Sequence, residues 1–196
     1  MYTYKATIKK VINRSTIMLD IDLGFKLTKK NQVYKISSIN GYKCRSKPIN
    51  AKYKLLSLLN IGDSVIIKSQ YKRNRFSCDI INNDDYRLYH YKGSTKKIVD
   101  GDTADFNIDL GFGIYFTERF RFFGIDAWET RGDEREKGLL AKQRVIELLS
   151  EHNEIIIKTQ KDSKGKYGRY LCDILVPSEK LSVCQILMNE GHALPY

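Results

Sequence analysis

The chain has 196 residues, of which 42% are apolar, so it can form one ordinary domain or two small ones and is not a disordered tail. Lys and Arg outnumber Asp and Glu by 34 to 23, which points first to nucleic acid as a partner and then to an anionic membrane; a merely solubilising surface is the plain alternative. No apolar run is long enough to cross a bilayer, and the N-terminus lacks a signal-peptide pattern. We therefore expect a cytoplasmic protein with no membrane association.

An internal repeat organises the chain. Three pairs of segments match in the same order: 9–25 with 96–112, 66–70 with 156–160, and 78–80 with 172–174. Self-similarity of this kind indicates a duplicated structural unit. We predict two tandem domains, 1–86 and 87–196, with the join near residues 84–94.

Strands are predicted in both copies from alternating apolar residues. Ile17, Leu19 and Ile21 alternate with polar positions in the first copy, and Phe106 and Ile108 do so in the second. A further strand is expected over 119–123. Both copies should therefore bury one face of each strand.

A helix is predicted over residues 134–149, with a counterpart at 51–59. Its apolar residues fall largely on one stripe: Leu139, Leu140, Val145, Ile146, Leu148 and Leu149. Strands follow at 154–159 and 169–176. A last short helix begins near Ser182, which forms a capping box with Gln185, and ends at Gly191. This order predicts a mainly β (α+β) protein made of two tandem, five-stranded, OB-fold-like barrels with packed helices.

Charge is divided unevenly between the two copies. Residues 1–94 hold 19 Lys and Arg against 6 Asp and Glu, whereas residues 95–196 hold 15 against 17. The first copy therefore presents a basic surface, and the second holds most of the carboxylates.

The carboxylates of the second copy cluster around one strand. Asp100 and Asp102 flank a glycine, and Asp126 and Glu129 follow the strand that carries Arg121. An Asp-Gly-Asp segment alone is a common hairpin turn. In this combination the carboxylates suit a hard cation such as calcium, Glu129 can hold and deprotonate a water, and Arg121 can neutralise a phosphate.

The second half, from about residue 94 onwards, resembles the staphylococcal nuclease (thermonuclease) family. The motifs that carry the resemblance are Val-Asp-Gly-Asp-Thr at 99–103, the spacing from arginine to glutamate over 121–129, and Lys-Tyr-Gly-Arg at 166–169. The resemblance implies an OB-type barrel, a calcium cofactor and hydrolysis of DNA or RNA phosphodiesters to products with a 3′-phosphate and a free 5′-hydroxyl.

The same resemblance implies the metal site. Asp102 and Asp126 would bind calcium directly together with the main-chain carbonyl of Ala127, and Asp100 would lie in the outer shell. Where the family usually has Thr-Pro, this chain has Ala127 and Trp128. Any residue supplies the carbonyl, and Trp128 could either stack on a base or shield the loop.

The resemblance also implies the catalytic and substrate-binding residues. Glu129 would act as the base or position the water. Arg121 and Arg169 would hold the phosphate and stabilise the transition state. Lys166 and Tyr167 would contact the terminal phosphate of the nucleotide.

The first copy has lost every carboxylate of this set. The aligned positions are Asn13 for Asp100, Ser15 for Asp102, Lys35 for Arg121, Asn40 for Asp126, Lys43 for Glu129 and Arg75 for Arg169. We predict a degenerate, basic domain that neither binds calcium nor cleaves but holds the polyanionic backbone. Tyr34, Tyr42, Tyr53 and Tyr71 could stack on bases, although a half-buried position in the barrel is the favoured interpretation for each.

The leading hypothesis is a calcium-dependent nuclease that acts on DNA or RNA and has a non-catalytic basic companion domain. The alternative is a tandem nucleic-acid-binding or interaction protein with little or no cleavage. The Lys-, Asn- and Tyr-rich composition fits an AT-rich genome and suggests a phage protein acting in its host cell.

Overall fold

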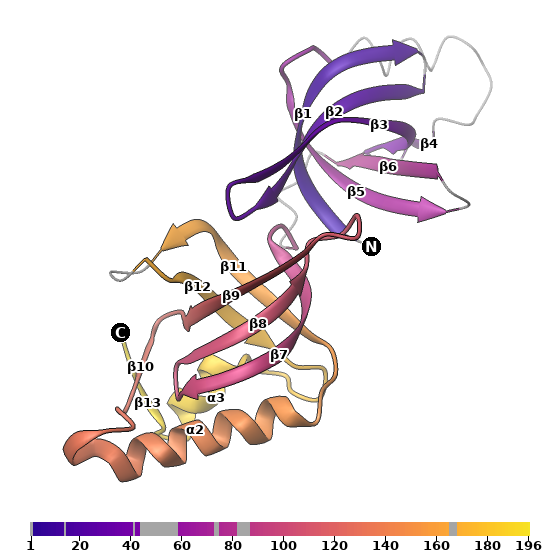
Figure 1. The fold of residues 1–196 in the computed structure, drawn as a ribbon. Coiled ribbons are helices and arrows are strands. Elements are labelled where there is room, and N and C mark those ends of the chain that lie inside the picture. Colours follow the sequence, from indigo (N-terminus) through magenta and orange to yellow (C-terminus); the bar gives the residue numbers. More distant parts are fainter. Residues whose placement is uncertain are drawn as a thin grey trace. The chain divides into compact units, whose positions relative to one another are not determined.

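The computed structural model of the chain describes residues 2–13, 15–40, 42–43, 59–72, 75–81, 87–164 and 168–196. The chain divides into two compact units, Met1–Tyr89 and His90–Tyr196, and each is built around a closed barrel (Figure 1). The predicted mainly β class with OB-like barrels is thereby confirmed.

The first barrel is closed by five strands in the order β2-β1-β5-β6-β3, with β3 returning to pair with β2. A short sixth strand, β4, pairs with β3. The bounds are β1 (Tyr2–Asn13), β2 (Thr16–Gly24), β3 (Leu27–Ile39), β4 (Tyr42–Lys43), β5 (Ser64–Lys72) and β6 (Arg75–Ile81).

The second barrel has the same connectivity, with the order β11-β12-β9-β8-β7. In both barrels the third strand pairs in parallel with the last one, β3 with β6 and β9 with β12, whereas the other pairs that close the barrels are antiparallel. The bounds are β7 (His90–Asp100), β8 (Thr103–Asp109), β9 (Tyr115–Phe122), β11 (Ile155–Lys164) and β12 (Tyr170–Leu175).

The core of each barrel follows the alternation seen in the sequence. Ile17, Leu19 and Ile21 are completely buried in the first barrel, as are Phe106 and Ile108 in the second. Successive side chains of a strand point to opposite faces, so alternate residues fill the interior. The strands predicted at 154–159 and 169–176 correspond to β11 and β12, the former extending further than expected.

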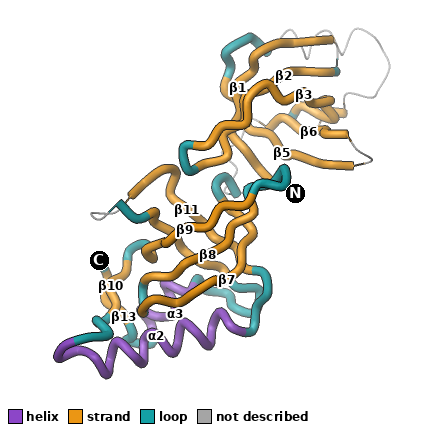
Figure 2. Tube along the Cα trace, viewed as in Figure 1, coloured by secondary structure: helices purple, strands orange, loops and turns teal. Residues whose placement is uncertain are grey.

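Two helices and a single 3₁₀ turn belong to the described part of the second unit, and Figure 2 shows them gathered at one end of its barrel. The 3₁₀ turn η1 (Gly132–Glu134) leads into α2 (Arg135–Ser150), which contacts β7, and α3 (Val183–Asn189) contacts α2 and β12. At the start of α3, Ser182 Oγ accepts a hydrogen bond from Gln185 N, and Gln185 Oε1 accepts one from Ser182 N. The predicted capping box is therefore present.

The apolar stripe predicted for α2 is partly wrong. Leu139, Leu140 and Ile146 remain exposed at 40%, 61% and 36%, and the helix buries a narrower face instead. That face consists of Gly138, Ala141, Val145, Leu148 and Leu149. Its first residues are small because other parts of the chain approach the helix closely there.

The helix predicted at 51–59 lies almost wholly outside the described residues. None of the helices in the described ranges has the length and apolar character of a membrane-spanning segment.

Candidate active site

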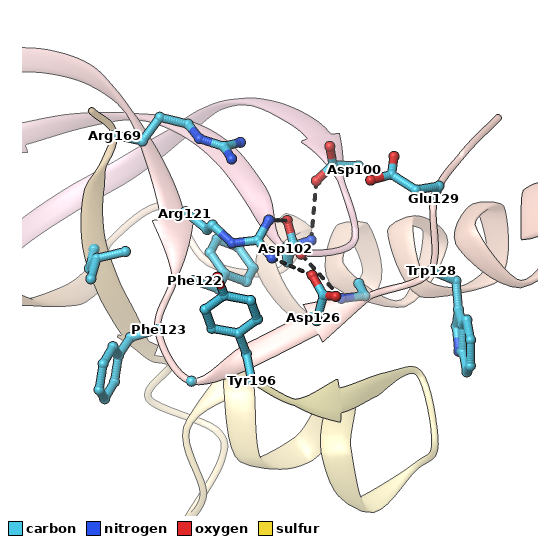
Figure 3. Close-up of a pocket in the computed structure, with 13 residues that line it drawn as sticks. Asp100, Asp102, Arg121, Phe122, Phe123, Asp126, Trp128, Glu129, Arg169 and Tyr196 are labelled. Atoms are coloured by element: carbon cyan, nitrogen blue, oxygen red, sulfur yellow. Dashed lines mark hydrogen bonds and ion pairs between the residues drawn. The ribbon is translucent and has the colours of Figure 1, made fainter. Parts of the chain in front are cut away.

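A pocket of about 550 Å³ opens on the second unit beside β9 and the strand that follows it (Figure 3). Its lining includes the four acidic residues singled out in the sequence and both arginines: Asp100, Asp102, Asp126, Glu129, Arg121 and Arg169. The backbone of Ala127 also reaches the pocket. The chain thus brings together residues that are up to 69 positions apart in the sequence.

The turn between β7 and β8 presents the first two aspartates. Asp100 pairs with Thr103 across this turn, and Asp102 N donates a hydrogen bond to Asp100 Oδ1 over 3.2 Å. A side chain at Gly101 would not fit, because a Cβ there would lie 2.8 Å from the Cβ atoms of both Ala127 and Ala141. The turn therefore packs against both the Asp126 segment and α2.

Asp102 is the buried member of the group, with only 5% of its surface exposed. Its Oδ1 accepts hydrogen bonds from Arg121 Nη1 at 3.0 Å and Thr103 Oγ1 at 2.9 Å, and its Oδ2 accepts one from Ala127 N at 3.1 Å. Burial raises the pKa of Asp102, while the Ala127 amide and the Arg121 charge act in the opposite direction. These donors fix both carboxylate oxygens in position.

Arg121 bridges the two aspartates that were predicted to bind the metal. Its Nη1 donates to Asp102, and its Nη2 donates to Asp126 Oδ1. The ring of Tyr196 covers the guanidinium, with 5.6 Å between its centroid and Arg121 Cζ. Figure 3 shows Arg121 between the two carboxylates with Tyr196 beside it.

The segment that carries Asp126 is a short strand, β10 (Ile125–Ala127), paired with β13 (Ala193–Pro195). Asp126 lies opposite Leu194 in this pair, and Tyr196 N donates to Gly124 O over 3.0 Å. The position of Asp126 thus depends on a strand almost 70 residues later in the chain.

Glu129 and Arg169 complete the pocket from two different segments. Glu129 is exposed in the loop after β10, and Figure 3 shows its carboxylate pointing toward that of Asp100. Arg169 lies just before β12, where its Nη1 donates to Thr103 Oγ1 over 3.2 Å. The Trp128 ring lies 4.5 Å from Lys137 Nζ, so Lys137 covers part of the tryptophan that precedes Glu129.

The donor chemistry of the pocket fits a hard divalent cation. The carboxylates of Asp102 and Asp126 both pair with one positive group, the guanidinium of Arg121. The carbonyl of Ala127 belongs to the same strand as Asp126 and supplies the kind of oxygen that such a cation prefers. Within the described ranges, however, no three His, Cys, Asp or Glu side chains converge closely enough to form a ready metal cage. Arg121 fills the space between the two aspartates, so a metal ion would have to compete with it.

Lys166 and Tyr167 lie outside the described residues. Tyr196 lines the pocket although nothing in the sequence singled it out, since it follows no periodic pattern and belongs to no motif. Tyr34, one of the tyrosines considered for base stacking, is completely buried, so its ring is not accessible to a nucleic-acid base.

The first unit repeats the backbone framework of this pocket. Ile36 N donates to Ser15 O over 2.8 Å, as Phe122 N donates to Asp102 O over 2.8 Å. Ser15 N donates to Asn13 Oδ1 over 3.1 Å, the equivalent of the bond between Asp102 and Asp100.

The strand register also agrees between the units. Thr16 pairs with Lys35 on β3, as Thr103 pairs with Arg121 on β9. The turns after β2 and β8 match as well, because Asp22 and Asp109 each accept a hydrogen bond from the amide of the glycine two residues later. Both units therefore place residues of aligned sequence at equivalent backbone positions. Only the second unit has carboxylates at the positions of Asp100, Asp102 and Asp126.

Fold and pocket together define a class, a small OB-type β-barrel that gathers carboxylates and arginines in one cleft. Residues 119–196 match the family described as Staphylococcal nuclease homologue. The second unit is thus similar to this family over residues 119–196, in agreement with the resemblance found in the sequence. A curated relative, Endonuclease YhcR of Bacillus subtilis (strain 168), is 31% identical over 114 residues. That match covers 54% of this chain but 9% of the relative, so the chain spans a small part of the length of that protein.

Proposed function

We propose that this protein is a calcium-dependent nuclease whose second unit hydrolyses phosphodiester bonds of DNA or RNA. The observation that carries the proposal is the convergence of four carboxylates and two arginines in one pocket of a staphylococcal nuclease-like domain. The name of the B. subtilis relative, an endonuclease, supports the same activity. We further propose that residues 87–196 form the catalytic domain, and residues 1–86 a degenerate basic domain that aids nucleic-acid binding.

Asp102, Asp126 and the carbonyl of Ala127 would hold the metal, with Asp100 in its outer shell. The bound ion would supply positive charge beside the attacked phosphate and lower the pKa of an associated water.

The side chains of the pocket then divide the chemistry. Glu129 accepts the proton of the attacking water, whose oxygen forms the new bond to phosphorus as the bond to the 5′ oxygen breaks. Arg121 and Arg169 hold the phosphate through charge-assisted hydrogen bonds and offset the negative charge that develops. Lys166 and Tyr167 are proposed to contact the terminal phosphate of the bound nucleotide.

Cleavage of single- and double-stranded DNA and RNA, with calcium and with EDTA, tests this proposal. We expect cleavage only with calcium, and products with a 3′-phosphate and a 5′-hydroxyl. Glu129→Gln should lower kcat roughly 100-fold or more, because a positioned general base contributes about 10² to 10⁴ in rate. The matched control is Glu136→Gln on α2, a charge change outside the pocket, which should retain wild-type activity. Full activity in EDTA, or in the Glu129 variant, would contradict the mechanism.

One observation favours the alternative, a tandem binding protein with little cleavage. Arg121 occupies the space between Asp102 and Asp126, so in this arrangement both carboxylates proposed to hold the metal are already paired with a guanidinium. Salt-sensitive binding of nucleic acid without any metal-stimulated cleavage would support that function instead.

A further inference from the structure

The first unit carries the framework of the catalytic pocket without its carboxylates. Asn13, Ser15 and Thr16, with Lys35 facing them, keep the backbone bonds and the strand register of the second unit. We propose that Asn13, Ser15, Thr16 and Lys35, supported by Lys10, form a metal-independent binding site for the phosphodiester backbone of nucleic acid. The inference rests on the proposed function, to which it adds a second, non-cleaving phosphate site.

Electrostatics distinguish the two frameworks. In the second unit the arginine of the framework is paired with two carboxylates, so an incoming phosphate meets four acidic groups and needs a cation. At the equivalent positions the first unit has Ser15 and Asn40, which carry no charge. Within the described part of the chain, no carboxylate forms an ion pair with Lys35. A phosphate can therefore approach this lysine without a metal.

The register of β1, β2 and β3 places a second lysine near the first. Thr16 pairs with Asn13 and Lys35, and two residues further along β2, Met18 pairs with Lys10 and Val33. Residues two apart in a strand lie on the same face, so the side chains of these two rows share the outer surface of the barrel.

The outer surface at these rows is open and mostly uncharged apart from the lysines. Lys10 and Lys35 are exposed, and Val33 is 50% exposed. The nearest acidic residue along β2 is Asp20, which already pairs with Lys9 at 3.8 Å and accepts a hydrogen bond from Asn31 N at 2.8 Å. The two lysines are therefore available to a ligand, and Val33 adds apolar surface two residues from Lys35 on the same strand.

Nucleic acid is the occupant that this chemistry favours. Residues 1–94 hold 19 basic against 6 acidic residues, so the field around the site attracts a polyanion. The hydroxyl of Ser15 and the ammonium group of Lys35 are donors suited to phosphate oxygens. The exposed side chain of Val33 can contact sugars and bases, whereas it offers nothing to the carboxylates of an acidic protein.

Binding of a labelled single-stranded oligodeoxynucleotide to the full chain in EDTA tests the site. Fluorescence anisotropy at several salt concentrations gives the affinity and its salt dependence. Lys35→Gln should weaken binding roughly three- to tenfold at low salt and reduce the salt slope by about 0.7, the value for one phosphate contact on a single strand. Lys35→Arg, which keeps the charge, should retain the wild-type affinity.

Lys5→Gln is the matched control, because Lys5 is likewise an exposed lysine but lies on β1, toward the opposite end of that strand from Asn13. We expect it to change the affinity by less than about twofold. Equal losses in Lys5→Gln and Lys35→Gln would overturn the site in favour of diffuse attraction. No loss in Lys35→Gln would overturn it as well, and so would displacement of the oligonucleotide by poly-glutamate at equal charge concentration, which would indicate an acidic protein partner.

The proposed nuclease activity is judged separately. Cleavage by the same wild-type preparation is measured after calcium is added. If no cleavage occurs while Lys35→Gln still weakens binding, the catalytic proposal fails and the phosphate site stands. If cleavage occurs but the Lys35 variant binds normally, the phosphate site fails alone.

Discussion

Gly138 of α2 lies directly against the main chain of Glu129. A Cβ built on Gly138 would lie 2.2 Å from the carbonyl oxygen of Glu129 and 2.7 Å from that of Trp128. Glycine inside a helix costs about 1 kcal/mol relative to alanine, so the helix alone would favour a larger residue here. The glycine allows the loop that presents Glu129 to rest on the helix.

We predict that Gly138→Ala separates activity from folding. The new methyl group must push the loop of Glu129 away, because the atoms that it meets belong to the backbone. The gain in helix propensity partly offsets the clash, so the free energy of unfolding should fall by no more than about 1–3 kcal/mol. Cleavage rates should fall at least tenfold with KM nearly unchanged, measured beside thermal unfolding.

Gln143→Ala is the control for this substitution, because it adds alanine to an exposed position of the same helix. It should leave the free energy of unfolding within about 0.5 kcal/mol of wild type and the cleavage rate unchanged. Wild-type cleavage by Gly138→Ala would mean that the position of the loop does not matter for the reaction.

Arg121 should compete with calcium for the aspartates. A unit charge about 4 Å from another contributes on the order of 4 kcal/mol near a protein surface, so removing the guanidinium leaves a strongly attractive pair of carboxylates. We expect Arg121→Gln to bind calcium at least about tenfold more tightly than wild type in the absence of substrate, while losing cleavage. Calorimetric titration with calcium measures this.

Arg119→Gln provides the comparison for Arg121. Arg119 pairs with Asp105 on the same barrel, with 2.7 Å between Arg119 Nε and Asp105 Oδ1, and does not line the pocket. Its removal should leave calcium affinity unchanged. Weaker calcium binding by Arg121→Gln would show that the arginine helps to organise the metal site rather than competing for it.

Tyr196 should act on the reaction through Arg121. Tyr196 is 80% exposed as a whole residue, so the contact of its ring with the guanidinium contributes little to stability, roughly 0.5–1 kcal/mol. Tyr196→Ala should therefore lower kcat/KM several-fold with nearly unchanged thermal stability, and Tyr196→Phe should retain most of the activity. Tyr115→Ala, at a tyrosine that is 74% exposed and outside the pocket, should have no such effect.

The ion pair between α2 and the end of α3 should make stability depend on acid. Arg144 Nε and Nη2 donate to the two carboxylate oxygens of Glu190 at 2.7 and 2.8 Å, and this pairing lowers the pKa of Glu190. Because the folded state has the lower pKa, the stabilisation is present above the unfolded value and is lost as the pH falls through the folded value.

Urea unfolding of wild type and Glu190→Gln at neutral pH and at about pH 3 measures this contribution. Glu190 is 36% exposed, so solvent screening limits the difference to about 0.5–1 kcal/mol at neutral pH, and the difference should become smaller as the pH falls through the folded pKa of Glu190. A difference that persists in acid would assign the effect to packing of the side chain rather than to its charge.

The barrel strands could be predicted from the sequence because their burial repeats locally. The alternation of Ile17, Leu19 and Ile21 with polar residues was enough to predict which face of β2 is buried, because alternate residues of a strand lie on the same face. The buried face of α2 was harder to predict. Leu140 fits an apolar stripe, yet the helix turns Gly138 inward because a loop distant in sequence needs the space.

The candidate pocket was predictable where its residues belong to motifs and not elsewhere. Asp102 and Arg121 could be recognised by their spacing, but nothing in that spacing shows that one guanidinium would bridge Asp102 and Asp126. Tyr196 escaped detection because it reaches the pocket through the pairing of two three-residue strands, β10 and β13, which are too short to show a periodic pattern.

The pairing of β10 with β13 also sets the order in which the second unit can mature during synthesis. All five strands of its barrel have been made once the chain reaches Leu175, whereas the partner of the Asp126 segment begins only at Ala193. In the order of the sequence, the strands of the barrel are therefore complete before the strand that pairs with the Asp126 segment.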